Sequence, residues 1–139
     1  MPLVLDDPQR VADWVGTRLG YAAPSVDAAI GYEIDGELRA GVYFDALTAS
    51  NIFAHIASEA HAPRSMIEAA VRYVFDQLKL TRMSFGIPAD NLRARAFVEA
   101  MGCAVETRLR KAAGAHDILI YVMWAHDEFP QRFLKRGTK

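Results

Sequence analysis

The sequence predicts an α+β fold in which helices pack on one mixed β-sheet, and three observations lead to this class. The apolar pattern changes between helical and strand periodicity in the order α, βββ, α, β, α, ββ. Asp35-Gly36 lies between two strand-like segments and is a strong hairpin signal, because a type I′ turn needs positive φ. A strand–helix–strand unit between residues 50 and 88 predicts a right-handed parallel crossover. We therefore expect a mostly antiparallel sheet with one parallel central pair.

Length and composition favour a single globular domain over residues 1–139. Hydrophobic residues make up 52% of the chain and charged residues 24%. The net charge of −1 argues against broad electrostatic binding to nucleic acid or to an anionic membrane. The longest apolar run, ILIYVMWA, is far shorter than the roughly 20 residues of a membrane helix. A first segment unlike a secretory signal and a single cysteine, Cys103, fit a cytoplasmic protein.

The first half of the chain begins with a helix and continues as a three-stranded meander. Pro8 suits the first turn of a helix over residues 8–19, and Gly20 ends it. Two strands flank Asp35-Gly36, and a third follows at residues 50–58. The predicted buried face of the helix is Val11, Trp14, Val15 and Leu19.

Two further helices and three strands complete the predicted order. Ser65 and Glu68 match a capping box, which places the start of the second helix at Ser65, and a strand follows at residues 81–88. Asn91 is a good N-cap for the third helix and Gly102 its C′ residue. Strands at 103–111 and 116–125 follow, and the basic tail RFLKRGTK is expected to be a solvated end. The predicted buried faces are Ile67, Val71, Val74 and Leu78, then Leu92, Ala96, Phe97 and Ala100.

From about residue 8 to 125 the chain resembles the GNAT superfamily of N-acetyltransferases. The most specific part is Asn91, a helix, and then Gly102-Cys103, because the family often has Asn, a helix and Gly-Phe at this spacing. The segments GVYFDALTASNIFAHIA and FDQL are similar to short, divergent members carried by bacteriophages and prophages. The resemblance implies that the two parallel central strands splay apart and that acetyl-CoA and an amine enter the cleft from opposite sides.

The resemblance also assigns cofactor-binding residues. Pantetheine would pair with the strand edge at residues 54–58, and the pyrophosphate would lie near residues 59–66, where a helix start favours phosphate. Asn91 would order the cleft wall, a role compatible with a plain N-cap, and Arg95, one turn later, would reach a phosphate, although Arg95 taken alone is better explained as a solvated helix arginine. The implied cofactor-binding residues are Ile56, Ala57, Ser58, Arg64, Ser65, Met66, Asn91 and Arg95. No metal is expected.

A general base is needed if the amine arrives protonated. Histidine titrates nearest to neutral pH, so His55 is the first candidate, Glu59 the second, and His61 lies in the same loop. Alternation places His55 on one strand face with Asn51, Phe53 and Ala57. A structural or surface role remains an alternative for each of these residues.

The chain departs from the family pattern at the phosphate loop and at the general acid. Glu59, Ala62 and Arg64 stand where the family has Gln or Arg and two small residues, so the glycines that admit phosphate are missing. Val98 replaces the tyrosine that protonates the leaving thiolate, with Tyr121 as a substitute donor. Cys103 replaces the family phenylalanine and is interpreted as a small buried hydrophobe rather than a nucleophile.

Two functions from different classes remain open on the sequence. The first is an acyl-CoA-dependent N-acyltransferase with CoA and an amine as its partners. The second is a catalytically inactive module that keeps the fold for binding or assembly. The apolar final strand ILIYVMW is explained equally by burial within the chain or by a homodimer.

Overall fold

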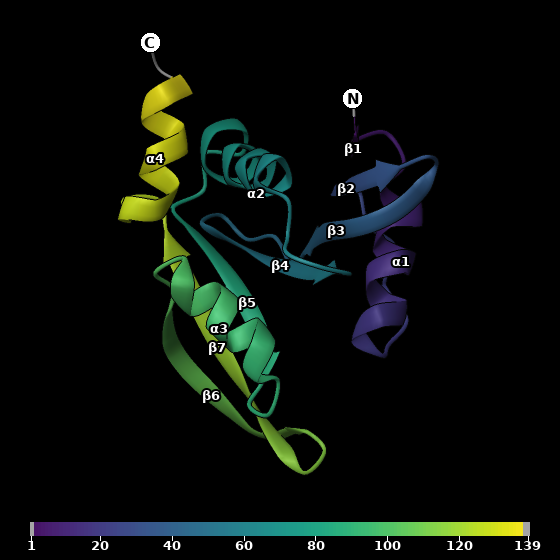
Figure 1. Ribbon diagram of the computed structural model, residues 1–139. Helices are drawn as coiled ribbons and strands as arrows, with labels where there is room; N and C mark the ends of the chain where they lie inside the picture. The colour runs from purple at the N-terminus through teal and green to yellow at the C-terminus, as the bar shows by residue number, and fades with distance from the viewer. Residues whose placement is uncertain (1, 138–139) are drawn as a thin grey trace.

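The computed structural model describes residues 2–137, and within them seven strands form one sheet (Figure 1). The strands are β1 (Leu3–Val4), β2 (Ala29–Ile34), β3 (Glu37–Asp45), β4 (Asn51–Ser58), β5 (Arg82–Pro88), β6 (Ala104–Ala113) and β7 (His116–Trp124). The helices are α1 (Pro8–Leu19), α2 (Arg64–Val71), which continues as a π-helical segment (Arg72–Gln77), α3 (Leu92–Ala100) and α4 (Glu128–Gly137).

The sheet order is β1-β2-β3-β4-β5-β7-β6, and the pairing confirms the predicted fold class. Every described pair is antiparallel except β4 with β5. Asp35 and Gly36 both have positive φ, as the predicted hairpin turn requires. β7 lies between β5 and β6, so burial within the chain accounts for its apolar sequence.

The parallel pair is short, and beyond it the sheet divides. β4 and β5 pair at three positions, Asn51 with Arg82 through Phe53 with Ser84. β4 then stays with β3 as far as Ser58, whereas β5 stays with β7 as far as Pro88. Each strand therefore follows its antiparallel neighbour, and the two diverge (Figure 1).

Helices cover the two faces of the sheet unequally. α2, α3 and α4 contribute to the larger apolar core, which includes the inward side chains of β3, β4, β5 and β7. α1 packs on the opposite face against β2 and β3, and it approaches closely because Gly31 and Gly41 lie beneath it. A Cβ at either glycine would lie 2.8–2.9 Å from a methyl carbon of Val11. α1 has the predicted bounds, with Val11 and Val15 fully buried but Leu19 36% exposed.

The predicted capping box of the second helix is wrong. α2 begins at Arg64, its N-cap is Pro63, and no side chain of the described residues caps it. Glu68 pairs instead with Arg72, with 3.0 Å between Oε2 and Nε. The extended backbone of Pro63 provides the start, because its carbonyl oxygen accepts from the N–H groups of Met66 and Ile67.

In the third helix the predicted cap is confirmed, and of the predicted face only Phe97 packs inward. Asn91 Oδ1 accepts from the N–H of Ala94 at 3.1 Å. Leu92 is 69% exposed, whereas Val98 is buried, because α3 is rotated relative to the face we predicted. The side chains that pack inward have the spacing i, i+3, i+4, i+7, namely Ala94, Phe97, Val98 and Met101.

The sequence prediction missed β1 and α4, and it was wrong to treat Phe133 and Leu134 of the basic tail as part of a solvated end. α4 packs along α2, and Phe133 within it is only 2% exposed. Arg72 Nη2 donates to the carbonyl oxygen of Phe133 at 2.9 Å, and the guanidinium of Arg64 lies 5.3 Å from the centre of its ring. Residues 138 and 139 of the tail lie outside the described residues.

Phe133→Ala should lower the free energy of unfolding by about 3–5 kcal/mol, because it removes a buried aromatic side chain from the core. Arg132→Ala is the matched control on the exposed side of α4 and should cost less than about 1 kcal/mol. Urea denaturation of both variants measures the difference. Equal, small effects would show that α4 does not belong to the core.

Candidate functional site

The divergence of β4 and β5 gives the site its frame. Residues 54–58 of β4 keep their pairing with β3 but lie beyond the last pair with β5. Their edge on the β5 side is therefore open to hydrogen bonding by an extended ligand. The side chains of these residues alternate between two faces, one toward α2 and one toward α1.

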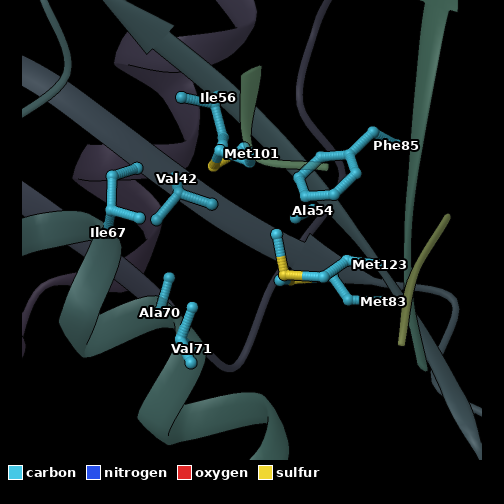
Figure 2. Close-up of a pocket in the computed structure, with 10 residues that line it drawn as sticks. All are labelled: Val42, Ala54, Ile56, Ile67, Ala70, Val71, Met83, Phe85, Met101 and Met123. Carbon is cyan, nitrogen blue, oxygen red and sulfur yellow. The ribbon is translucent and has the colours of Figure 1, made fainter. Parts of the chain in front are cut away.

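An apolar pocket lies on the α2 face of this segment (Figure 2). It is a small gap among core side chains, and its accessible volume of about 10 Å³ is barely enough to admit one water molecule. Three of its side chains are methionines, whose unbranched thioethers adapt their shape easily. The lining residues are Val42, Ala54, Ile56, Ile67, Ala70, Val71, Met83, Phe85, Met101 and Met123.

His55 lies on the opposite face, at the centre of a hydrogen-bonded cluster. Its Nε2 is 2.7 Å from Oδ1 of Asp45, and its Nδ1 is 3.2 Å from the hydroxyl of Tyr21. The imidazole stacks on Tyr43, with 4.4 Å between ring centres and 15° between planes. The hydroxyl of Tyr43 donates to that of Tyr21 at 3.4 Å. The cluster thus combines a carboxylate, an imidazole and two phenols.

Both phenols of this cluster remain neutral near pH 7. Burial is the main cause that raises the pKa of Tyr21, and the nearby carboxylate of Asp45 also raises it. Burial likewise raises the pKa of Tyr43, together with its hydrogen bond to Tyr21. Each hydroxyl can therefore donate a hydrogen bond at physiological pH.

Glu59 and His61, the other base candidates, lie elsewhere. The Glu59 carboxylate contacts Arg18 at 3.3 Å and Arg39 at 3.5 Å, so its charge is balanced on the α1 side. Its repulsion of a phosphate is correspondingly reduced. His61 is exposed in the loop between β4 and α2. The structure brings neither residue into the His55 cluster.

The predicted phosphate-binding residues are dispersed around the start of α2. Arg64 points toward Phe133 of α4, and Ser65 is exposed. Met66 is fully buried, and its N–H already donates to the carbonyl oxygen of Pro63. Arg93, which the sequence reasoning missed, donates from Nη2 to the carbonyl oxygen of Ala60 at 2.9 Å. This bond joins the first turn of α3 to the loop before α2.

Asn91 and Arg95 are engaged within the chain. Asn91 caps α3 and is exposed. Arg95 donates from Nε to the hydroxyl of Tyr121 at 3.2 Å and from Nη1 to the carbonyl oxygen of Ala89 at 2.9 Å. Arg95 thereby joins α3 to β7 and to the residue that follows β5.

No tyrosine stands at the position of the family's general acid, so we consider three side chains near it: Val98, Tyr121 and Cys103. Val98 is buried. Tyr121 is buried, and its hydroxyl donates to Glu99 at 2.5 Å, while burial raises its pKa. Burial raises the pKa of the Cys103 thiol to about 12, so its thiolate is scarce at neutral pH. Cys103 belongs to the apolar core, as expected from the sequence.

The sequence reasoning found His55 but missed the residues that surround it. Tyr43 and Asp45 are two residues apart and therefore lie on the same face of β3. Tyr43 is directly opposite His55 in the antiparallel pairing of β3 with β4. The register between the two predicted strands was the signal that could have placed Tyr43 next to His55. Tyr21 follows the left-handed residue Gly20, and a tyrosine in a turn carries no comparable signal.

Within residues 2–137, no group of three or more His, Cys, Asp and Glu side chains is arranged to hold a metal ion. None of the helices in the described part of the chain has the length and apolarity needed to cross a membrane.

Comparisons with known proteins identify the fold. No protein-family model matches the chain, and no curated protein sequence matches it. Among solved structures, a chimera of the spermidine N-acetyltransferase SpeG from Vibrio cholerae and hSSAT superposes with a TM-score of 0.68 at 15% identity, covering 98% of this chain and 100% of the chimera. The ribosomal-protein-S18-alanine N-acetyltransferase from Escherichia coli gives 0.66 at 13% identity, covering 88% and 92%.

A third match, an acetyltransferase from T. thermophilus, gives a TM-score of 0.65 at 19% identity and covers 78% of this chain. The chain spans 65% of that protein and 59% of another matched acetyltransferase. These neighbours are GNAT-family acetyltransferases, and at such identities the likeness establishes the fold. The GNAT-like fold expected from the sequence is therefore confirmed, whereas the similarity to bacteriophage members stays a prediction.

Asn91 allows its capping role to be separated from a ligand role. Asn91→Asp should leave the melting temperature unchanged, because both residues cap helices well, whereas Asn91→Ala should cost about 1 kcal/mol. If Asn91 also faces a cofactor, the added charge of Asn91→Asp should weaken CoA binding in calorimetry. Unchanged affinity together with unchanged stability would leave the cap as its sole role.

Proposed function

We propose that the protein is an acyl-CoA-dependent N-acyltransferase, which transfers an acetyl group from acetyl-CoA to an amine by direct attack. One observation carries the proposal. The same five residues of β4 that lose their partner strand have an adaptable apolar pocket on one face and the His55 cluster on the other. In this arrangement a thioester and an amine would meet at one strand segment from opposite sides.

In this proposal the open edge at Ile56, Ala57 and Ser58 would pair with the amides of pantetheine. The start of α2 would take the pyrophosphate through its first N–H groups, which belong to Arg64 and Ser65. Met66 would support this helix start from the core, while Asn91 and Arg95 would shape the facing wall. Arg93 extends this set, because its guanidinium lies at the loop before α2.

The chemistry requires little beyond positioning. His55, with Glu59 as the second candidate, would be the final acceptor of the proton that the incoming ammonium loses. The neutral amine then attacks the thioester carbonyl, and a backbone N–H would stabilise the tetrahedral oxyanion. A thiol has a pKa of about 8.5, so the CoA thiolate can leave near neutral pH without a strong acid.

The rival proposal, an inactive module with this fold, has support of its own. The loop before α2 lacks glycines, the pocket is small, and Val98 cannot donate a proton. The bond from Arg93 to Ala60 also joins two elements between which a cofactor would pass. A cytoplasmic setting and a homodimer accompany either proposal as expectations, and acetyl-CoA binding separates the two.

Arg64→Glu should weaken CoA binding by about 1–3 kcal/mol, the scale of a charge-assisted hydrogen bond to phosphate. Isothermal titration calorimetry measures the affinity. Arg110→Glu makes the same change of charge on the exposed strand β6 and should leave the affinity almost unchanged. Pantetheine, which lacks the nucleotide phosphates, should bind far more weakly and be insensitive to Arg64→Glu. Absence of CoA binding by the wild-type protein would favour the inactive module.

Acetyl transfer should proceed without a tyrosine general acid. The Tyr121 hydroxyl is held by Glu99 and Arg95, so Tyr121→Phe should leave kcat within about twofold of wild type. General acid catalysis is typically worth about 10²–10⁴-fold. A loss of that size in Tyr121→Phe, measured by release of free CoA with a panel of amines, would identify Tyr121 as the proton donor.

A further inference from the structure

The surroundings of His55 determine which of its atoms carries the proton. A carboxylate can only accept a hydrogen bond, so Nε2, at 2.7 Å from Asp45, must be the protonated nitrogen. In the neutral imidazole Nδ1 is then the acceptor, and the Tyr21 hydroxyl at 3.2 Å is its donor. Both ring nitrogens are therefore engaged, and the ring face stacks on Tyr43. An amine entering on this side cannot reach a ring nitrogen without displacing Tyr21.

Tyr21 is the most exposed member of the cluster. It is 44% exposed, whereas the side chains of Asp45 and His55 are 33% and 20% exposed and Tyr43 is almost fully buried. The Tyr21 oxygen uses its own proton toward His55 and accepts from Tyr43 at a long 3.4 Å, so it retains acceptor capacity for an N–H of a ligand. An ammonium attracted to this face by the Asp45 carboxylate can therefore donate a hydrogen bond to the Tyr21 hydroxyl.

The cluster lies where the proposed reaction would occur. His55 is two residues beyond Phe53, the last residue of β4 that pairs with β5. Its two sequence neighbours, Ala54 and Ile56, line the apolar pocket from the other face of the strand. The relay described next rests on the proposed function, because it uses the amine that this function requires.

We propose that Tyr21 is the residue that deprotonates the acceptor amine and that it passes a proton to His55, which Asp45 holds in place. An N–H bond of the ammonium breaks as an O–H bond forms on Tyr21, and the original O–H bond of Tyr21 breaks as N–H forms at Nδ1. The products are a neutral amine, a neutral Tyr21 and an imidazolium beside the Asp45 carboxylate. Tyr21 touches the substrate and is the catalytic residue; Asp45 is a positioning residue.

Asp45 gives the relay its direction. With Nε2–H bound to the carboxylate, only Nδ1 can receive the proton, and Nδ1 faces Tyr21. The imidazolium that forms keeps both N–H groups paired, one with Asp45 and one with the Tyr21 oxygen. The Asp45 carboxylate, whose Oδ1 lies 2.7 Å from Nε2, balances the positive charge of the imidazolium, and the His55 side chain is 20% exposed. Without Asp45 either tautomer could form, and the one protonated at Nδ1 would present a donor to Tyr21 rather than an acceptor.

The first test does not depend on turnover. Two-dimensional ¹⁵N NMR of the imidazole at a pH where His55 is neutral should show the Nε2–H tautomer in the wild-type protein and in Tyr21→Phe. Asp45→Leu should shift the signals toward a mixture of tautomers. A wild-type imidazole protonated at Nδ1 would overturn the relay, because His55 could not accept from Tyr21.

The second test measures catalysis with an alkylamine, which is protonated at neutral pH. Tyr21→Phe should lower kcat by about 10²-fold or more, the scale of general base catalysis, and leave the calorimetric affinity for CoA unchanged. Tyr32→Phe, on β2, is the matched control and should behave as wild type. An arylamine that is already neutral at the assay pH should recover most of the lost rate in Tyr21→Phe.

The outcomes separate the two levels of the proposal. Transfer by the wild-type protein that persists at full rate in Tyr21→Phe would overturn the relay and leave the N-acyltransferase proposal standing. An equal loss with alkylamine and arylamine would also overturn it, because the loss would not concern the ammonium proton. Absence of transfer by the wild-type protein would overturn the acyltransferase proposal and the relay together.

Discussion

Three parallel residue pairs join the two halves of the sheet. The place where this pairing ends sets the position of the open edge of β4, of the apolar pocket and of the His55 cluster. Side chains reinforce the seam: Asn51 Oδ1 accepts from Arg82 Nε at 2.9 Å and from the Ser84 hydroxyl at 2.7 Å. Immediately beyond it, β4 presents an open edge, an apolar pocket and the His55 cluster. The site is thus defined by an interruption in strand pairing rather than by an inserted loop.

The elements with strong local signals were predictable from the sequence. Residues 8–19 have an uninterrupted helical period that ends at a glycine, and Asp35-Gly36 strongly favours a tight turn. Weak local signals failed. Ser65 and Glu68 match a capping box, but the helix begins directly after Pro63 instead. The apolar face of α3 could not be chosen from its short sequence, because alanines satisfy several rotations equally well. Phe133 gave no signal because its partner Arg72 is 61 residues away in the chain.

The strand that carries His55 was predictable from the sequence, whereas the residues that hydrogen-bond to His55 were not. His55 could be placed on the correct face of β4 by alternation, and its neighbour Tyr43 follows from register once β3 and β4 are paired. Asp45 and Tyr21 come from a strand end and a turn, so their approach depends on the path of the chain in three dimensions. Arg93 reaches Ala60 for the same reason. Local patterns predict which residues share an element, and tertiary packing decides which side chains meet.

The close approach of α1 to the sheet limits which substitutions this protein can tolerate. Tyr21 lies two residues after the end of α1, and its N–H donates to the carbonyl oxygen of Gly16, so its position depends on a helix that rests on two glycines, Gly31 and Gly41. Any larger residue at either position would push against Val11 and lift the helix, and the hydroxyl would move away from His55 although no residue of the cluster had changed. Conservative substitutions outside the cluster can thus be deleterious. More positions on this face of the sheet are therefore sensitive to mutation than the polar residues of the His55 cluster alone.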